Sequence, residues 1–265
     1  MSQKTALCFT LFAFLSSAYA EESSNLSNKI ASMNIRTQSE LTWIPLNPQF
    51  PDMAKFAVVS GNPQTGPSTM LMSFTPVLPG SPVGGLHKHS NAYTTVVLAG
   101  TPKHGPSPEE AISFSPGSYW NQPGNEAHYD VCEGTEPCVI LTYWTDIRDY
   151  FPAEEKDSTL AWKGVLADQV VWEKGTNKKS KISVASENTE KGTSVQFTKY
   201  AAGYKSKVLT STTNTEKVLI SGNFQYGTDS LLSVNPGDII FQPSNQSYIE
   251  ACTDECILVT ISHGM

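Results

Sequence analysis

The feature that most constrains the fold is an internal repeat with a spacing of 120 residues. The segments 116–128 and 236–248 both carry Pro-Gly, then Gln-Pro, then Asn at matching positions. Two pairs of cysteines continue the match in the same order, the second after a gap of two residues. These pairs are Cys132 with Cys252 and Cys138 with Cys256. Matches that recur in one order indicate a duplicated unit.

The two copies are expected at about Leu41–Ala161 and at 170–265, joined by the charged stretch 152–163, for which a short helix stays open. Short runs rich in Val, Ile, Thr, Tyr and Phe, separated by Gly, Pro and Asn, predict strands. No window has the pattern of an amphipathic helix of a dozen residues. We therefore expect an all-β protein with a small jelly-roll barrel in each half. The predicted strands include Lys55–Val59, Met70–Phe74, Thr94–Leu98, Val139–Trp144, Val195–Tyr200, Val218–Ile220 and Ile257–Ile261.

Residues 1–20 have the pattern of a secretion signal. Lys4 precedes an apolar run at 6–15, and Ala18-Tyr19-Ala20 has the form of a cleavage site. The run is about half the length that a membrane-spanning helix needs, so a retained anchor is the weaker interpretation. We expect cleavage near Ala20, no membrane span and a secreted or periplasmic protein.

The composition excludes two classes of protein. With 39% hydrophobic and 16% charged residues in a chain of 265, it is neither disordered nor fibrous. The net charge of −7, only two arginines and the lack of a basic stripe beside aromatic residues argue against a nucleic-acid partner.

The histidines give the strongest functional signal. His87 and His89 are two residues apart at the start of a predicted strand, so their side chains share one face. His128 follows in the next conspicuous motif, and three imidazoles grouped in this way favour a metal site. The alternative is that the three rings are packed core or loop residues. We expect His104 and His263 at the surface.

These residues resemble the cupin superfamily, and with the duplication the chain is similar to a secreted bacterial double cupin of the ChrR-like or acetylacetone-dioxygenase-like kind. The resemblance implies two tandem cupin barrels. The first motif is carried by Gly85, His87, His89, Tyr93 or Thr94, and Gly100, and the second by Gly117, Pro123, a displaced Gly124, and His128.

Two departures from the cupin pattern decide which ligands are expected. Tyr93 or Thr94 stands where the family has a glutamate, so the ligand set is three histidines holding one divalent ion of Fe, Zn, Mn, Ni or Cu. In the second copy, Leu209, Ser211 and Tyr248 occupy the histidine positions, and only Glu216 remains near the glutamate position. The resemblance therefore implies a metal in the first copy and none in the second.

Three neutral imidazoles leave a divalent ion with its full charge of +2, which favours a small anionic ligand. With iron this suits dioxygenase-like chemistry, and with zinc it suits hydrolysis. A non-catalytic metal-binding, ligand-binding or sensor protein, a storage-like protein and a homo-oligomer all stay open. The residues that could lie around the metal or in its pocket are Tyr93, Glu126, Asp130 and Trp120. The alternatives are solvated loop carboxylates for the two acids and packing in the barrel for the two aromatic residues.

Four cysteines remain after removal of the leader. The favoured pairing is Cys132–Cys138 and Cys252–Cys256, because each pair flanks a short turn at equivalent positions of the two copies. A zinc site built from all four thiolates is the alternative. Loops as short as these contribute only about 2 kcal/mol each when closed by a disulfide.

Overall fold

The computed structural model describes residues 35–77, 85–157, 160–190, 192–227 and 231–263. The expected leader at 1–20 lies outside these residues. The described part of the chain is built from strands, with two short 3-10 helices at Gln38–Glu40 and Ala167–Gln169. No helix in it has the length and apolar character needed to cross a bilayer. The prediction of an all-β fold is confirmed, and each of the seven predicted runs lies within a strand.

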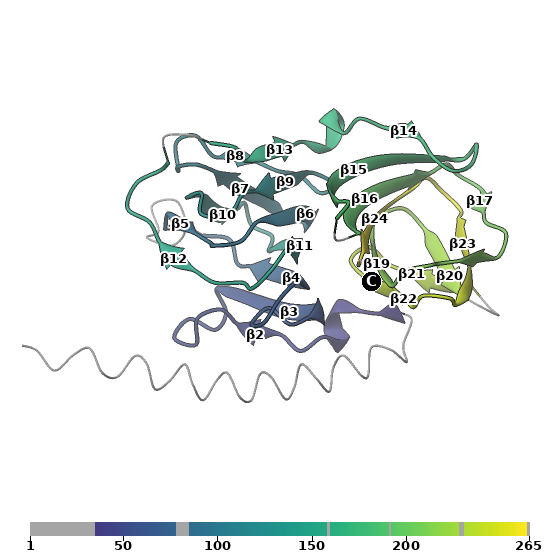
Figure 1. Ribbon diagram of the computed structural model, residues 1–265, viewed down its shortest axis with the longest axis horizontal. Coiled ribbons are helices and arrows are strands. Elements are labelled where there is room, and N and C mark those ends of the chain that lie inside the picture. The colour runs from purple at the N-terminus through teal and green to yellow at the C-terminus, as the bar shows by residue number, and fades with distance from the viewer. Residues whose placement is uncertain (1–34, 78–84, 158–159, 191, 228–230, 264–265) are drawn as a thin grey trace, which may run out of the picture.

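Two seven-stranded antiparallel sheets dominate the molecule and lie side by side in Figure 1. The first has the order β13-β9-β6-β11-β4-β3-β2 and the second the order β1-β22-β19-β24-β16-β15-β14. The first sheet consists of β2 (Ile44–Pro45), β3 (Ala54–Gly61), β4 (Ser68–Phe74), β6 (Tyr93–Ala99), β9 (Tyr119–Gln122), β11 (Cys138–Trp144) and β13 (Lys163–Val165). The second consists of β1 (Ile35–Arg36), β14 (Glu173–Lys174), β15 (Ser180–Asn188), β16 (Thr193–Tyr200), β19 (Thr215–Ser221), β22 (Ile239–Gln242) and β24 (Cys256–Ser262).

Smaller sheets close each half into a barrel. In the N-terminal barrel they are β10-β7-β8 and β12-β5, and in the C-terminal barrel β17-β23-β20-β21, with β18 also paired to β23. Their bounds are β5 (His87–Lys88), β7 (Thr101–Gly105), β8 (Ile112–Ser113), β10 (Tyr129–Glu133), β12 (Phe151–Pro152), β17 (Tyr204–Lys205), β18 (Leu209–Thr210), β20 (Phe224–Gly227), β21 (Leu232–Val234) and β23 (Ser247–Cys252).

The two barrels repeat each other down to single hydrogen bonds. Asn125 and Asn245 are the non-glycine residues with positive φ among those described, at 63° and 61°. The amide of Asn125 donates to the carbonyl of His89 at 2.6 Å, and the amide of Asn245 donates to Ser211 at 2.7 Å. Asn125 and Asn245 are 120 residues apart and His89 and Ser211 are 122 apart, so these equivalences follow the sequence repeat, whose spacing shifts by two residues between the two segments.

One edge strand of each large sheet comes from a segment outside the two predicted copies. β1, which precedes the predicted start of the first copy at Leu41, pairs with β22 of the C-terminal barrel. β13, at the end of the connection between the copies, pairs with β9 of the N-terminal barrel. The described residues of the stretch 152–163 form no helix, and the 3-10 turn Ala167–Gln169 follows it.

Three apolar cores explain the long buried runs in the strands. One core lies between the two large sheets and takes residues from both, whereas the other two fill the interiors of the barrels. In β6, Val96 and Leu98 face the core between the sheets, and Tyr93 and Val97 face the interior of the barrel. Because both faces of β6 are covered, nearly the whole strand is buried.

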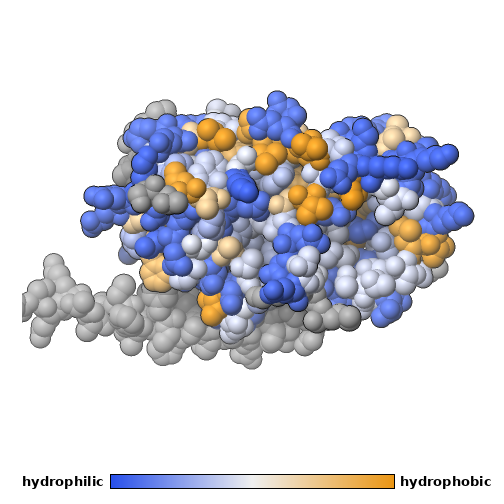
Figure 2. Space-filling view, turned by 45° about the horizontal axis from the view of Figure 1, so that its top comes forward, coloured by the Kyte–Doolittle hydropathy of each residue, from blue (hydrophilic) through white to orange (hydrophobic). Residues whose placement is uncertain are grey.

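Both favoured disulfides, Cys132–Cys138 and Cys252–Cys256, are present in the structure. Each joins two consecutive strands of different sheets across a short turn, β10 to β11 and β23 to β24, so the four-thiolate zinc site is excluded. On the face shown in Figure 2, apolar side chains of the described residues form separate groups among hydrophilic ones.

Candidate metal centre

Three histidines of the N-terminal barrel converge where two chain segments pair. His87 opens β5, His89 follows one residue after its end, and His128 directly precedes β10. The backbones of His87 and His128 exchange hydrogen bonds of 3.0 and 2.8 Å. One ligand nitrogen from each of the three rings lies within 4.8 Å of the others. The structure therefore brings together the three side chains that the spacing predicted.

The main chain fixes which nitrogen of each ring points into the site. In all three histidines Nδ1 contacts a backbone carbonyl, which can only accept a hydrogen bond, so Nδ1 carries the proton. The acceptors are Gly85 for His87 at 3.0 Å, Glu126 for His128 at 3.1 Å, and Asp149 for His89. The Nε2 atom of each neutral ring is then left with a lone pair directed at the space between the rings. Orientation of metal-binding histidines by such contacts is a general feature of metal sites.

Burial keeps two of the rings neutral. The pKa of His89 is lowered to about 4 and that of His128 to about 3, chiefly by burial and also by the neighbouring His87, against the opposing effect of Asp130. Neutral imidazole is the form that binds a metal ion. Aromatic rings pack around the cluster, with Trp144 edge-on to His89 and the exposed Tyr150 stacked on His87, both at 4.8 Å between ring centroids.

Tyr93 takes the place that the cupin pattern gives to a glutamate. Its hydroxyl lies 2.9 Å from Nε2 of His128, whereas Thr94, on the opposite face of β6, bonds to Asn121. Burial raises the pKa of Tyr93 well above its usual value, with the Asp130 charge acting in the same direction. Tyr93 is therefore a neutral phenol that can donate a hydrogen bond next to the three nitrogens.

Asp130 and His104 complete the polar surroundings, and His104 corrects a prediction. His104 is fully buried rather than at the surface, because it lies on β7, which pairs with β10. Its Nδ1 lies 2.5 Å from Oδ1 of Asp130, while Oδ2 of Asp130 lies 3.7 Å from His87 Nε2 and 3.5 Å from His128 Nε2. Burial raises the pKa of Asp130, but His104 and the other two imidazoles outweigh that effect and lower it.

Glu126 and Trp120 contribute in ways that the pattern did not specify. The carboxylate of Glu126 is buried and accepts the amides of Ala161 and Trp162 at 2.9 and 3.2 Å, so it holds the connecting segment, and only its main-chain carbonyl contacts His128. Trp120 stacks on His104, with ring centroids 4.6 Å apart. It supports the surroundings of the cluster rather than forming an open pocket wall.

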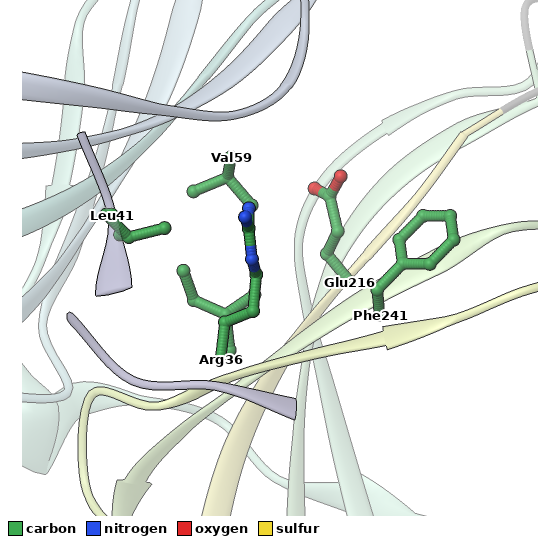
Figure 3. A pocket seen from close by; sticks show the side chains of 6 residues that line it. Arg36, Leu41, Val59, Glu216 and Phe241 are labelled. Carbon is green, nitrogen blue, oxygen red and sulfur yellow. The ribbon is translucent and has the colours of Figure 1, made fainter. Parts of the chain in front are cut away.

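A small pocket lies between the two barrels, away from the histidine cluster. Arg36, Leu41, Val59, Glu216, Ile239 and Phe241 line it (Figure 3). Glu216 therefore faces the junction between the barrels and not the interior of its own barrel. His263 is partly buried, contrary to prediction, because its Nε2 lies 3.0 Å from Oε2 of Glu216. Neither residue contributes to the candidate metal centre.

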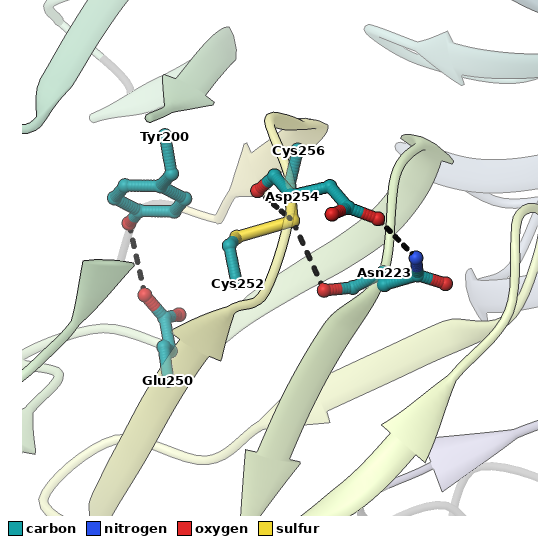
Figure 4. The surroundings of a disulfide bond; sticks show 6 residues. All are labelled: Tyr200, Asn223, Glu250, Cys252, Asp254 and Cys256. Carbon is teal, nitrogen blue, oxygen red and sulfur yellow. Dashed lines mark hydrogen bonds between the residues drawn. A yellow bond between two sulfur atoms is a disulfide. The ribbon is translucent and has the colours of Figure 1, made fainter. Parts of the chain in front are cut away.

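In the C-terminal barrel an ammonium group replaces the histidine cluster. Leu209 pairs with Tyr248 just as His87 pairs with His128. Lys217 contacts the carboxylate of Glu250 and lies 3.3 Å from the hydroxyl of Tyr248. The other carboxylate oxygen of Glu250 accepts the Tyr200 hydroxyl at 2.9 Å, close to the Cys252–Cys256 disulfide (Figure 4). The described residues give this barrel no group of three metal-binding side chains.

Comparison with known proteins supports the fold at low sequence identity. No family model and no curated protein matches the sequence. Among solved structures, a candidate dioxygenase from Nostoc punctiforme matches with a TM-score of 0.66 and 11% identity, covering 88% of this chain and 83% of that one. AerE from Microcystis aeruginosa matches with a TM-score of 0.58 and 13% identity over 88% and 99% of the two chains. An R92A mutant of Bacillus subtilis oxalate decarboxylase matches with a TM-score of 0.52 and 12% identity over 88% and 78%.

The chain has the cupin fold. The three similar structures cover both barrels of this chain, since each matches most of its length. At 11–13% identity they establish the architecture and leave the chemistry to the residues of the site.

Proposed function

We propose that this cupin binds one divalent metal ion through His87, His89 and His128 and uses it in dioxygenase-like chemistry on a small organic anion. The observation that carries the proposal is the orientation of the three rings. Each Nδ1 donates to a backbone carbonyl, so three Nε2 lone pairs are held toward one point before any ion arrives. Such a ligand set suits Fe, Zn, Mn, Ni or Cu.

The protein would supply binding and orientation around the ion. Bound to three neutral imidazoles, a divalent ion keeps its +2 charge and acts as a Lewis acid toward an anionic ligand. Tyr93 can donate a hydrogen bond to an oxygen atom of that ligand, because its hydroxyl lies beside His128 Nε2. Tyr150, which is exposed and stacked on His87, marks the side from which a small molecule can approach. Oxalate decarboxylase, named among the similar structures, acts on oxalate, which is a small organic anion, and this agrees with such a substrate.

A non-catalytic metal-binding or sensor role is the second candidate. The enclosure of the histidines favours it, since His89 and His128 are only 5% and 1% exposed. An enclosed ion can be retained and sensed without turnover.

We also propose that the protein is exported and that it consists of two copies of one cupin domain. Removal of the leader near Ala20 would deliver the chain to the periplasm or the exterior, where the two disulfides are expected to persist. The two copies, at 41–161 and 170–265, would be a metal-binding cupin domain and a degenerate one, and their similarity to ChrR-like and acetylacetone-dioxygenase-like cupins belongs to the proposal. Mass spectrometry of the exported protein would locate the new N-terminus, and a chain that retains residues 1–20 would contradict export by this route.

Metal analysis of the purified protein tests the metal site. We expect about one divalent ion per chain in the wild type, and almost none in His89→Ala. His263→Gln is the matched control, because it removes an imidazole outside the cluster and should leave the metal content unchanged. A wild type without stoichiometric metal after loading with each of the five ions, or a His89→Ala variant that retains it, refutes the site.

Oxygen consumption separates catalysis from binding. The iron-loaded protein would be assayed with a panel of β-dicarbonyl compounds and thiol acids. Uptake that depends on both substrate and His89 supports the dioxygenase proposal. Full metal occupancy with no uptake across the panel supports the sensor alternative.

A further inference from the structure

We propose that Asp130 supplies a fourth, carboxylate ligand to the metal centre and that the buried His104 positions it. This inference rests on the proposed metal site. It changes the expected ligand set from three neutral groups to three neutral groups and one anion. It also places the carboxylate on the strand that follows His128, and not on β6, where Tyr93 stands.

The position of Asp130 fits a ligand. Two donor atoms bound to one ion at about 2.1 Å lie roughly 3 to 4 Å apart. Oδ2 of Asp130 lies 3.5 Å from Nε2 of His128 and 3.7 Å from Nε2 of His87. The side chain is 29% exposed, so an ion can reach this oxygen from the solvent.

The donor and acceptor roles of the atoms around Asp130 favour a cation between them. Nδ1 of both rings donates to the main chain, which leaves both Nε2 atoms as acceptors in the neutral form. A carboxylate oxygen is also only an acceptor. The Tyr93 hydroxyl can donate to Nε2 of His128, whereas Oδ2 of Asp130 and Nε2 of His87 are both acceptors and repel unless a positive charge lies between them. A divalent ion supplies that charge without protonating either ring.

His104 fixes the orientation of the carboxylate. The amide nitrogen of Gln122 donates to the carbonyl of Glu126 at 3.1 Å, so its oxygen must face Nε2 of His104, which lies 3.1 Å away. Nδ1 of His104 faces the other acceptor, Oδ1 of Asp130. His104 therefore lies between two acceptors, with Nδ1 directed at the carboxylate of Asp130. It occupies Oδ1, so only Oδ2 is free to bind an ion.

The C-terminal barrel provides an internal comparison. The repeat spacing of 120 residues aligns Asp130 with Glu250, His128 with Tyr248, and Gln122 with Gln242. Glu250 contacts the ammonium group of Lys217, which lies over the Tyr248 ring at 4.5 Å from its centroid. In the C-terminal barrel, the carboxylate at this position therefore faces a cation that the chain itself supplies, the ammonium group of Lys217. In the N-terminal barrel Thr95 stands at the position that Lys217 has in the C-terminal barrel, so no lysine occupies this place beside Asp130.

Metal affinity and the spectrum of the cobalt-substituted protein test the role of Asp130. Co(II) is titrated into the metal-free wild type and into Asp130→Asn, Asp130→Ala and the control Glu133→Gln, which removes a carboxylate from the same strand. We expect the two Asp130 variants to bind Co(II) more than roughly 100-fold more weakly, beyond the 10- to 100-fold typical of residues that only orient a ligand. Their visible absorption bands should also change, because the coordination sphere changes. The control should match the wild type.

His104→Gln tests the positioning role. It should weaken Co(II) binding by roughly 10- to 100-fold and leave the pattern of visible bands unchanged. Wild-type affinity in this variant overturns the role of His104.

The outcomes distinguish this inference from the proposed function. If the wild type binds no Co(II), the metal site itself fails. If Asp130→Asn and Asp130→Ala bind with the wild-type spectrum and lose less than 100-fold in affinity, the three histidines suffice and Asp130 is not a ligand. Thermal unfolding of each metal-free variant is measured alongside, and the Asp130→Ala result decides the question if Asp130→Asn does not fold.

Discussion

The buried ion pair in the C-terminal barrel allows a quantitative test of how that barrel is held together. Lys217 and Glu250 are 10% and 1% exposed, and their charged groups are in direct contact. Burial lowers the pKa of Lys217, but the charge of Glu250 outweighs it, so the ammonium form is retained. Removing one partner leaves the other charge buried without compensation, which typically costs 3–5 kcal/mol, about the range we expect here.

The perturbation is a double-mutant cycle of Lys217→Met, Glu250→Gln and the combined variant. In Lys217→Met the orphaned carboxylate keeps one hydrogen bond, from Tyr200 at 2.9 Å, so we expect a loss of about 3 kcal/mol in the free energy of unfolding. Glu250→Gln should cost a similar amount, because the ammonium retains only Tyr248. The double variant has no unpaired charge, so its loss should fall short of the sum of the single losses by about 2 kcal/mol or more.

Urea unfolding followed by circular dichroism, with disulfides intact and a chelator present, measures these differences. The chelator removes any contribution of bound metal, so the result is independent of the proposed metal site. Strictly additive losses would show that Lys217 and Glu250 do not interact energetically. Such a result would also remove the internal comparison on which the role of Asp130 partly rests.

Two further predictions concern the junction of the barrels and a tight turn. Burial lowers the pKa of His263, but the charge of Glu216 has the larger effect, so this pKa is raised. For Glu216, burial raises the pKa, but His263 and other hydrogen-bond partners have the larger effect, so this pKa is lowered. The carboxylate contributes stability above its unfolded pKa of about 4.3 and loses it as pH falls, whereas the imidazole contributes below its unfolded pKa of about 6.5 and loses it as pH rises. His263→Gln should therefore cost about 1–2 kcal/mol more at pH 5.5 than at pH 8.5 in urea unfolding, and equal costs would refute the pairing. Gly100→Ala should lower the free energy of unfolding by about 2 kcal/mol or more, because φ is 72° and the added carbon would lie 2.6 Å from a backbone carbonyl. Gly66→Ala, with no atom within 4 Å of the added carbon, is its control and should change stability by less than about 0.5 kcal/mol.

The strands and the histidine cluster could be predicted because their determinants are local. Runs of β-branched and aromatic residues predict strands, and the two-residue spacing of His87 and His89 places both rings on one face in any strand. Only one link was non-local, the pairing of His87 with His128. The repeat and the second motif supplied it.

His104 could not be recognised as a buried residue from local pattern. It lies in Thr-Pro-Lys-His-Gly-Pro, a composition typical of a turn, yet β7 pairs over its whole length with β10. Burial at this position is decided by a partner strand that begins 28 residues after β7 starts. The repeat could have indicated that His104 is buried. Alignment of Gly105 with Gly227 matches His104 in the first copy with Tyr226 in the second, and Tyr226 is also buried. The edge strands β1 and β13 are two and three residues long, and a segment that short has no periodicity from which to predict its partner.

The interiors of the two barrels differ in the size of their side chains as well as in their charge. Residues at alternate positions of a strand share a face, so Tyr93 and Thr95 face the interior of one barrel, and Thr215 and Lys217 face that of the other. In a close-packed interior, the side chains at these two positions share a limited volume. The N-terminal barrel has the large residue first and the C-terminal barrel has it second. The lysine reaches the carboxylate in the barrel whose preceding interior residue, Thr215, is small. In the N-terminal barrel Tyr93 places a phenol beside His128 Nε2 and precedes Thr95, the position from which Lys217 reaches Glu250 in the other barrel.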